Sequence, residues 1–329
     1  MIPFDYRRAD DVLGAVTLVH EHENAAFLGG GTNLVDHLKL GVANPDLLVD
    51  VSRLPLDHVE PLPDGGVRIG AAVRNSDLAA HPLVRRRYPV LSQALLSGAS
   101  GQIRNLATTA GNLLQRTRCV YFTDVTTPCN KREPGSGCAA LAGYNRYHAV
   151  LGASPHCVAV HPSDLAVALV ALDAVIHVQG PDSARTIRAE DLHRLPGDEP
   201  DRDTVLAHGE LITAVDVPDL PITARSRYRK VRDRASYAFA LVSVAAAVDV
   251  EDGTVRDARV AFGGLAHKPW RAHRAEEVLR GAPATDDTVR QAAEAELAAA
   301  TPLPDNAFKP RMATGALVAT LRELTREQA

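Results

Sequence analysis

The chain has 329 residues, of which 46% are hydrophobic, so it is long enough for two or three compact units with buried cores. Its 36 basic and 40 acidic side chains give a net charge of −4, which argues against a general polyanion-binding role. The N-terminus shows no charged segment followed by an apolar run, and the longest apolar stretch, residues 165–176, is too short to cross a bilayer. These features predict a cytoplasmic protein without nucleic-acid or membrane partners.

Residues 1–55 have the pattern of an α/β unit. Apolar residues at helical spacing predict a helix over 10–22, and an apolar strand over 25–28 ends in three glycines. A short helix over 34–40 and an apolar strand over 47–51 follow. Strand, glycine turn, helix and strand in this order are typical of a βαβ unit.

The first strand leads into Gly29-Gly30-Gly31-Thr32-Asn33. Glycines let backbone N–H groups point at an anion, and Thr32 and Asn33 can add side-chain hydrogen bonds. The segment matches neither the G-x-G-x-x-G motif nor the P-loop motif. It therefore predicts either a tight turn or a phosphate site at the start of the next helix.

After residue 55 the sequence predicts a turn at 61–66 between two strands, and then helices from 75 and over 85–96. A second loop of small and hydroxyl-bearing residues follows at Thr108–Asn112. Two such loops in one domain can hold the two phosphates of a dinucleotide from opposite sides. Arg104 and Arg116 flank this loop and can offset phosphate charge. A helix cap followed by a turn is the alternative, because Thr and Asn favour caps.

All four cysteines of the chain lie within 39 residues, at Cys119, Cys129, Cys138 and Cys157. The segments between them, of nine, eight and eighteen residues, lack the paired spacing typical of structural zinc. Four thiolates can hold zinc or an iron–sulfur cluster, and widely spaced ligands on a long loop favour the bulkier cluster. Free buried cysteines are the alternative. Three nearby histidines are expected to be solvated or capping residues rather than ligands: His148, His156 and His161.

The remaining chain predicts a continuation of the second unit and then a third unit from about residue 225. The second unit is expected to end with a helix, a hairpin and a further strand, at 164–173, 175–187 and 211–217. Strands of the third unit are expected at 228–231, 240–250 and 255–262, although 239–247 has the length of a helix. Helices are expected at 270–280, 288–300 and 311–327.

Three segments resemble the FAD-binding subunits of the molybdenum hydroxylases, the xanthine dehydrogenase family. They are 112–119 (NLLQRTRC), 128–138 (PCNKREPGSGC) and 161–164 (HPSD), where relatives have a Ser-Asp pair. The resemblance covers essentially the whole chain and is nearest to the flavin subunit of periplasmic-type aldehyde oxidoreductases, which carry an extra 4Fe–4S cluster. Relatives without that cluster run almost directly from the second loop to the Ser-Asp pair, so the cysteine segment is an insertion.

The resemblance implies an α+β fold in which two subdomains of the vanillyl-alcohol-oxidase (PCMH) type hold FAD and a C-terminal domain adds a small antiparallel sheet and helices. The implied units are residues 1–55, residues 56–221 with an inserted iron–sulfur loop at 117–158, and residues 225–329.

The resemblance also implies individual roles. The FAD pyrophosphate would be bound by two loops, which comprise Phe27, Leu28, Gly29, Gly30, Gly31, Thr32, Asn33 and Leu34, and then Thr108, Thr109, Gly111 and Asn112. Asp164 would accept hydrogen bonds from the adenosine ribose. Ile212 would contact the flavin region, and Lys230 would stabilise reduced, anionic flavin. Cys119, Cys129, Cys138 and Cys157 would ligate the 4Fe–4S cluster.

One position departs from the family pattern. Several relatives place an aromatic residue against the flavin where this chain has Gly98. Tyr144 or Tyr147 of the inserted loop would then cover the ring instead.

The implied function is an electron-transfer subunit of an oxidoreductase, with no catalytic acid or base of its own. A partner with molybdenum cofactor would oxidise an aldehyde or N-heterocycle, and 2Fe–2S centres on a small partner would pass electrons to the FAD and on to an external acceptor. The complex would be a heterotrimer or a dimer of heterotrimers, and export with a signal-bearing partner would place it in the periplasm. Two alternatives are a self-sufficient flavin oxidase or reductase of the same fold and a zinc-stabilised, non-redox nucleotide-binding module.

Overall fold

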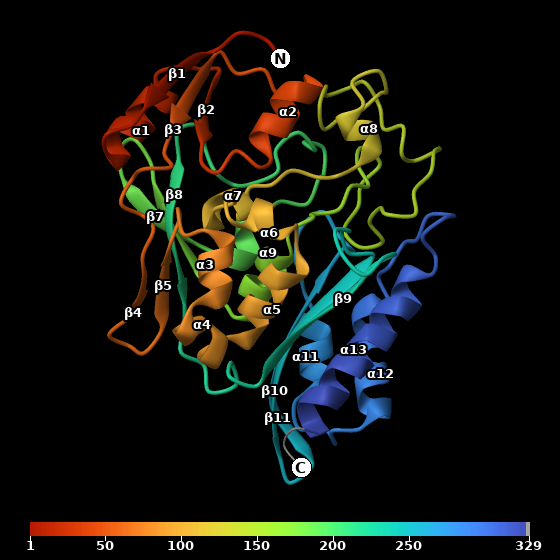
Figure 1. The fold of residues 1–329 in the computed structure, drawn as a ribbon. Coiled ribbons are helices and arrows are strands. Elements are labelled where there is room, and N and C mark those ends of the chain that lie inside the picture. The colour runs from red at the N-terminus through yellow and green to blue at the C-terminus, as the bar shows by residue number, and fades with distance from the viewer. Residues whose placement is uncertain (327–329) are drawn as a thin grey trace.

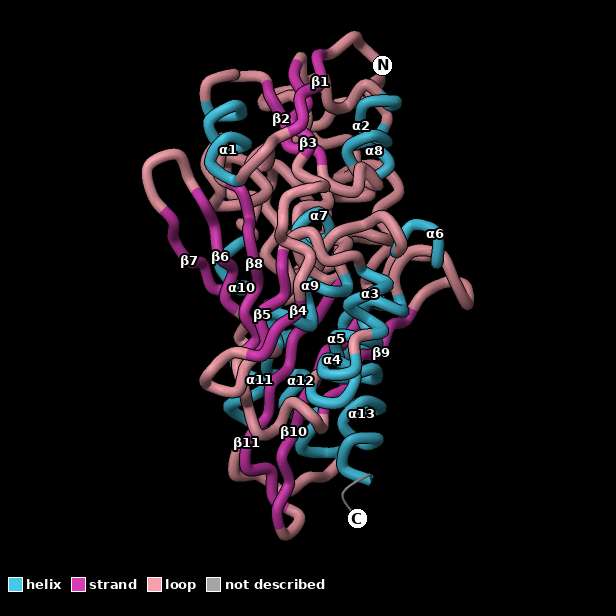
Figure 2. The backbone as a smooth tube through the Cα atoms, turned by 60° about the vertical axis from the view of Figure 1, so that its left-hand side comes forward, coloured by secondary structure: helices cyan, strands magenta, loops and turns pink. Residues whose placement is uncertain are grey.

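The computed structural model describes residues 1–326 and shows three units arranged along one long axis (Figure 1). A small α/β unit lies at the top, a five-stranded sheet with helices occupies the middle, and a four-stranded sheet with helices lies below. The hairpin of strands β10 (Val242–Glu251) and β11 (Thr254–Gly263) reaches the end opposite the N-terminal strands (Figure 2). Mixed helices and mainly antiparallel sheets confirm the predicted α+β class.

The N-terminal unit confirms the predicted βαβ arrangement. Its strands pair in parallel in the order β1-β3-β2. The elements are β1 (Asp5–Arg8), α1 (Val12–His20), β2 (Ala25–Leu28), α2 (Leu34–Leu40) and β3 (Leu47–Asp50). The sequence does not predict β1, because all four of its residues are exposed and it lacks an apolar pattern.

The middle unit is built on an antiparallel sheet of order β4-β5-β8-β6-β7, and the predicted strands and hairpin are confirmed. Its strands are β4 (Val59–Pro61), β5 (Val67–Gly70), β6 (Val175–Gln179), β7 (Ala184–Arg188) and β8 (Leu211–Val217). Helix α9 (Asp164–Ala171) lies at the centre of the core, and all eight of its residues are buried. A helix that is apolar on every side requires such a site.

The other helices of the middle unit are short: α3 (Asn75–Ala80), α4 (Pro82–Arg87), α5 (Pro89–Ser97), α6 (Gly101–Arg104), α7 (Thr109–Leu113), α8 (Val120–Thr123) and α10 (Ala189–Leu192). The single helix predicted over 85–96 is wrong. Pro89 starts a new helix there, and Tyr88 before it leaves the helical region with φ −135° and ψ 56°.

The C-terminal unit has an antiparallel sheet of order β12-β11-β10-β9 and three helices against it. Its remaining elements are β9 (Ser226–Val231), β12 (Trp270–Arg271), α11 (His273–Leu279), α12 (Asp286–Leu297) and α13 (Lys309–Arg326). Residues 239–247 could be a strand or a helix by sequence, and the structure shows a strand from Val242. The start of β10 is buried and pairs with β9 on one side and β11 on the other. The helix expected from residue 270 begins at His273, because Trp270 and Arg271 form strand β12 and pair with β11. The last predicted helix extends to residue 327, which lies outside the described residues.

The segment between α7 and α9, which carries the four cysteines, is mostly irregular but internally bonded. Asn130 Oδ1 accepts from the backbone N–H of Gly137 (2.8 Å). The Arg132 guanidinium donates to the carbonyl oxygens of Tyr121 (2.9 Å) and Phe122 (2.8 Å). The segment extends beside α2 (Figure 1), and its later part joins the C-terminal unit, where Val150 and Leu151 are buried in the core.

One buried arginine joins the C-terminal unit to the end of α9. Arg271 is 6% exposed, and it donates to the Val170 carbonyl oxygen (2.7 Å) and to Asp173 Oδ1 (2.7 Å). It also forms an ion pair with Glu276, which is 1% exposed. Loss of the guanidinium therefore leaves a buried carboxylate with much less compensating charge.

Replacing Arg271 with Met should lower the free energy of unfolding by about 3 kcal/mol, because the buried Glu276 carboxylate would keep only the more exposed Arg280 as a counter-charge. Urea denaturation followed by circular dichroism measures this change. Arg290→Met is the control: its pair with Asp287 is solvent-exposed, so less than about 1 kcal/mol is expected. Equal losses in the two variants would contradict the prediction.

Candidate functional site

The glycine loop after β2 and the loop before α7 pack directly against each other. A Cβ atom at Gly30 would lie 1.9 Å from the Leu106 carbonyl oxygen, and one at Gly29 would lie 3.2 Å from Thr108 Oγ1. Gly31 has φ of 71°, a conformation that L side chains rarely adopt. Glycine at these positions lets the two backbones come into contact. The presence of two such loops in one domain predicts that they lie together.

Two adjoining cavities lie on either side of this contact. The Phe27 cavity, of about 270 Å³, lies by the N-terminal unit and is lined by Phe27, the glycine loop, Leu211 and Ile212, among others. The Lys230 cavity, of about 350 Å³, lies toward the C-terminal unit and includes Leu95, Gly98, Asp164 and Lys230 in its lining. Thr32, Asn33 and Gly111 line both, so the cavities meet at the two loops. Together they fall within the range of about 300–1,000 Å³ typical of small-molecule sites.

The Lys230 cavity contains a buried ion pair at the start of α9. Lys230 Nζ donates to Asp164 Oδ2 (2.7 Å), and the Tyr228 hydroxyl donates to Asp164 Oδ1 (2.5 Å). Lys230 also donates to the Ser97 carbonyl oxygen (3.2 Å). Burial, with the nearby Asp164 charge, raises the pKa of Tyr228 well above its usual value, so the phenol stays a donor. The network fixes one carboxylate and one ammonium side by side on the cavity wall.

The structure shows how three residues with implied roles lie relative to one another. The resemblance places Asp164 at the adenosine ribose and both Ile212 and Lys230 at the flavin. Asp164 and Lys230 are bonded to each other on the wall of the Lys230 cavity, whereas Ile212 lines the Phe27 cavity. The three implied roles stay predictions.

Most of the remaining predicted residues line one cavity or both, but two do not. The Phe27 cavity and the Lys230 cavity between them are lined by Phe27, Gly29, Gly30, Gly31, Thr32, Asn33, Leu34, Thr108, Gly111 and Asn112. Thr109 is fully buried, and its hydroxyl donates to the Val73 carbonyl oxygen (3.0 Å). Leu28 lies in the β2 strand, where its carbonyl oxygen accepts from Val51. Thr109 and Leu28 therefore bond to residues outside the cavities and stabilise the loops that line them.

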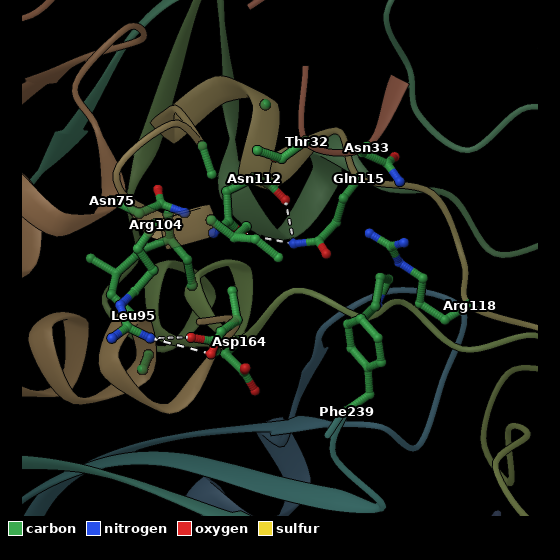
Figure 3. A pocket seen from close by; sticks show the side chains of 18 of the residues that line it. Thr32, Asn33, Asn75, Leu95, Arg104, Asn112, Gln115, Arg118, Asp164 and Phe239 are labelled. Carbon is green, nitrogen blue, oxygen red and sulfur yellow. Dashed lines mark hydrogen bonds between the residues drawn. The ribbon is translucent and has the colours of Figure 1, made fainter. Parts of the chain in front are cut away.

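Amide side chains tie the two loops to their surroundings. Asn33 Oδ1 accepts from the backbone N–H of Arg116 (2.9 Å). Asn112 Oδ1 accepts from Gln115 Nε2 (2.9 Å) and from the Ser163 hydroxyl (2.6 Å), and Figure 3 shows Asn112 and Gln115 together at the cavity. These bonds hold the loops at a fixed distance before any ligand binds.

The arginines expected to offset phosphate charge already have protein partners. Arg116 Nε is 2.6 Å from Asp203 Oδ2, and Arg104 donates to the Gly98 carbonyl oxygen (2.6 Å). Arg118, which the sequence does not predict at the dinucleotide site, lines the Lys230 cavity. Its Nε is buried without a hydrogen-bond partner among the described residues, and burial lowers the pKa of its guanidinium. In the sequence, Arg118 stands immediately before Cys119, and nothing in that location indicates that its side chain lines the cavity.

The aromatic residues at the cavity also differ from the expectation. Tyr144 and Tyr147 pack edge to face on each other, with ring centroids 6.1 Å apart, and neither lines either cavity. Tyr237 and Phe239, from the loop between β9 and β10, line the Lys230 cavity instead. The Arg118 guanidinium lies 5.2 Å from the Phe239 ring centroid, and Figure 3 shows the two side chains together.

Gly98 lies close to the ion pair of Asp164 and Lys230. A Cβ atom there would lie 3.1 Å from Asp164 Oδ2, which is a tight contact. A side chain at residue 98 would therefore require the Asp164 carboxylate to shift by a few tenths of an ångström.

The four cysteines, 38 residues apart at most, line one small cavity in the structure. All four thiols are free, and Cys129 and Cys138 form an isolated antiparallel bridge across the loop. Burial raises the pKa of Cys119 to about 12 and that of Cys157 to about 11. Without a cation in the cavity, these thiols would keep their protons.

Residues 1–326 contain no group of three or more His, Cys, Asp or Glu side chains arranged to hold a single metal ion. The predicted ligation of a metal or cluster by the cysteines is therefore not confirmed by the structure. The structure shows that all four cysteines line the same cavity. This arrangement differs from that of isolated cysteines in a hydrophobic core.

The histidines near the cysteines are less exposed than expected. His148 is 4% exposed and burial lowers its pKa to about 4, while His161 has a buried Nε2 and a pKa well below its usual value, also through burial. The expectation of solvated histidines is wrong for these two. His156 remains largely exposed and lies 3.4 Å from Asp198.

Phe122 lines the cysteine cavity and contacts two residues that line the Phe27 cavity. Phe122 is fully buried. The Arg116 guanidinium lies 4.7 Å from its ring centroid and the His37 ring 5.6 Å, and both of these residues line the Phe27 cavity. The cysteines thus lie behind the glycine-loop side of the site.

Two family profiles match the chain. The FAD binding domain in molybdopterin dehydrogenase matches residues 2–220, and the CO dehydrogenase flavoprotein C-terminal domain matches residues 226–324. The chain belongs to the FAD-binding subunits of the molybdenum hydroxylases. Family membership accounts for the paired loops and for the two cavities that meet at them.

Several members of this family are similar over almost the whole chain. The aldehyde oxidoreductase FAD-binding subunit PaoB of Escherichia coli is 52% identical over 325 residues, which cover 98% of each chain. The glyceraldehyde dehydrogenase medium chain of Sulfolobus acidocaldarius is 29% identical and covers 88% of this chain and 85% of its own. Carbon monoxide dehydrogenase from Hydrogenophaga pseudoflava, a solved structure, has a TM-score of 0.77 at 26% identity, with 99% of each chain covered. The predicted family and fold and the oxidoreductase-subunit class are confirmed.

Replacing Gly30 with Ala should release bound FAD, because the new methyl group would force the two loops apart at Leu106. We expect an affinity at least about tenfold weaker, equivalent to about 1.4 kcal/mol, measured by flavin fluorescence titration of the apoprotein. Gly101→Ala is the matched control, since nothing lies within 4 Å of a Cβ there. Wild-type affinity in Gly30→Ala would contradict the assigned loop contact.

Proposed function

We propose that this chain is the FAD-carrying electron-transfer subunit of an aldehyde-oxidising molybdenum hydroxylase complex. The observation that carries the proposal is the pair of adjoining cavities divided by two glycine-containing loops, a shape suited to a dinucleotide bent over its diphosphate. Bound FAD would accept and release electrons through its isoalloxazine ring. The 52% identity to an aldehyde oxidoreductase subunit favours an aldehyde over an N-heterocycle as the substrate of the complex.

We place the isoalloxazine ring in the Lys230 cavity and the adenosine in the Phe27 cavity. A buried ammonium suits the ring, because reduced flavin is anionic and a nearby cation stabilises it. The Asp164 carboxylate beside it can accept from ribityl hydroxyls of the same half of the cofactor. The diphosphate then lies at Thr32, Asn33 and Gly111, where the cavities meet.

The residues of the chain bind, orient and shield the cofactor. Glycine-loop N–H groups can face the diphosphate, and Arg118 adds a positive charge without a hydrogen bond at its Nε. Phe239 and Tyr237 would cover the open side of the ring in place of the aromatic residue that relatives have at position 98. Ile212 and Phe27 would enclose the adenine.

We further propose that Cys119, Cys129, Cys138 and Cys157 hold a 4Fe–4S cluster. Four free thiols around one cavity provide the ligand set that such a cluster needs. Buried thiols with raised pKa values lose their protons only when a cation takes their place, and iron supplies that charge. Bound iron would add a one-electron centre next to the FAD.

Partner subunits with molybdenum cofactor and 2Fe–2S centres would complete the complex, as a heterotrimer. The names of the relatives support this, since the medium chains among them are parts of larger enzymes. The units proposed for this chain are 1–55, 56–221 and 225–329. No helix in the described part of the chain is long and apolar enough to span a membrane. The cytoplasmic location and the number of heterotrimers stay predictions.

The complex tests this function directly. The chain, copurified anaerobically with its molybdenum and 2Fe–2S partners, should show flavin bleaching when an aldehyde is added. The isolated chain with FAD should show none, because it has no substrate site of its own. Bleaching by aldehyde in the isolated chain would instead support a self-sufficient flavin enzyme.

Replacing Cys138 with Ser should remove the broad iron–sulfur absorbance and most of the iron, while FAD stays bound, because the FAD cavities do not include this residue. Visible spectra with iron, sulfide and flavin analyses measure the outcome. Thr126→Ala, a change in the exposed part of the same loop, is the control. An unchanged spectrum in Cys138→Ser would exclude this ligand assignment.

Replacing Phe239 with Leu should make the bound flavin more fluorescent and raise its reoxidation rate by oxygen several-fold, because an aromatic ring in contact with flavin quenches it and excludes solvent. Steady-state fluorescence and stopped-flow reoxidation measure the two effects. Tyr144→Leu is the control, as Tyr144 is equally exposed but lies outside both cavities. Identical behaviour of the two variants would place the ring elsewhere.

A further inference from the structure

His148 lies between the cysteine cavity and the C-terminal unit. Its Nε2 is 3.1 Å from Cys119 Sγ, within hydrogen-bond distance for sulfur. Its Nδ1 is buried and has no hydrogen-bond partner in the described part of the chain. A metal-bound thiolate has no proton to donate, so the ring nitrogen facing it must be the donor. With the ring proton on Nε2, the bond to sulfur is made and no buried N–H is left unpaired.

We propose that His148 donates an Nε2–H···S hydrogen bond to Cys119 and thereby raises the reduction potential of the cluster. This inference rests on the proposed 4Fe–4S cluster, and it makes His148 a positioning and tuning residue rather than a ligand. Reduction adds negative charge, part of which spreads onto the ligand sulfurs. A donor to sulfur therefore stabilises the reduced cluster more than the oxidised one.

The C-terminal unit holds this histidine in place through its backbone. Lys309, at the start of α13, is fully buried, and its Nζ donates to the carbonyl oxygens of His148 (2.8 Å) and Gly264 (2.7 Å). Asn306 Nδ2 donates to the same His148 carbonyl oxygen (3.2 Å). Two donors on one carbonyl fix the backbone of His148, so the ring is presented to Cys119 by the packing of α13.

Lys309 also places an amine at this point that is only partly protonated near neutral pH, because burial lowers its pKa to about 7. No carboxylate among the described residues pairs with its ammonium, which bonds to carbonyl oxygens alone. A buried cation without a counter-ion is costly, and a cluster with four thiolate ligands is an anion. The His148 backbone and ring thus connect the buried ammonium to the cysteine cavity.

Another histidine of the same loop provides a matched comparison. His156 lines the cysteine cavity, yet its side chain is 48% exposed and lies 3.4 Å from Asp198. Its backbone carbonyl oxygen accepts from Asn130 Nδ2 (3.0 Å). No hydrogen bond joins its ring to a cysteine among the described residues, so its removal should leave the cluster sulfurs unaffected.

The test measures the cluster midpoint potential of the full-length, anaerobically purified chain by EPR-monitored redox titration. His148→Leu should keep its iron and sulfide but shift the midpoint downward by about 59 mV, a tenfold change in a one-electron equilibrium. His148→Gln, which keeps an N–H donor, should recover most of that shift, and His156→Leu should match wild type. A His148→Leu chain with a full cluster and the wild-type potential would overturn the inference.

A second measurement does not depend on the stability of the His148→Leu variant. Pulsed EPR of the reduced cluster in ¹⁵N-histidine-labelled His156→Gln protein should show one weakly coupled nitrogen. No coupling, or a coupling of the strength of a direct iron–nitrogen bond, would overturn the hydrogen bond. A wild-type chain that holds FAD but never iron would contradict the proposed cluster itself, and the inference with it.

Discussion

The Asp164 carboxylate makes the contact on which the arrangement of this molecule depends. It begins the buried central helix α9, after Ser163 caps that helix, and it accepts from Tyr228 and Lys230 of the C-terminal sheet. One acidic group therefore aligns the middle and C-terminal units and forms part of the cavity wall. It also lies against residue 98, where a Cβ atom would come within 3.1 Å of Asp164 Oδ2.

The cysteine loop places its four thiols around a cavity of their own, outside the Phe27 and Lys230 cavities. It packs beside α2, and its Phe122 contacts two residues that line the Phe27 cavity. With the isoalloxazine ring in the Lys230 cavity, the cluster would lie nearer the adenosine half of FAD than the ring. This placement favours a role in stabilising the loop and in storing an electron over a direct transfer to the ring.

Local patterns in the sequence were sufficient for most of the regular structure. Strong apolar periodicity predicted α9 and the β6–β7 hairpin, while β1 escaped because all of its residues are exposed. The division at Pro89 was available from proline chemistry, but the helical periodicity on both sides hid it. Segments whose form depends on partners far away in the chain could not be obtained from local signals.

In the candidate site, too, residues with a local sequence signal were predicted, and residues that depend on distant partners were not. The two loops were predicted because glycine and small hydroxyl residues carry a local signal. Arg118, Phe239 and His148 were missed or misjudged, because each acquires its role from a neighbour distant in sequence: a cavity, a ring or a sulfur atom. The 2.7 Å contact between Asp164 and Lys230 has no local signal either, because the two residues are far apart in the sequence.

Native mass spectrometry of the chain purified under nitrogen tests the central claim most directly. The account predicts a single species whose added mass equals one FAD together with one 4Fe–4S cluster on the same polypeptide. A bare polypeptide that gains no mass after incubation with FAD, iron and sulfide would contradict it. So would a polypeptide carrying one zinc ion and no flavin.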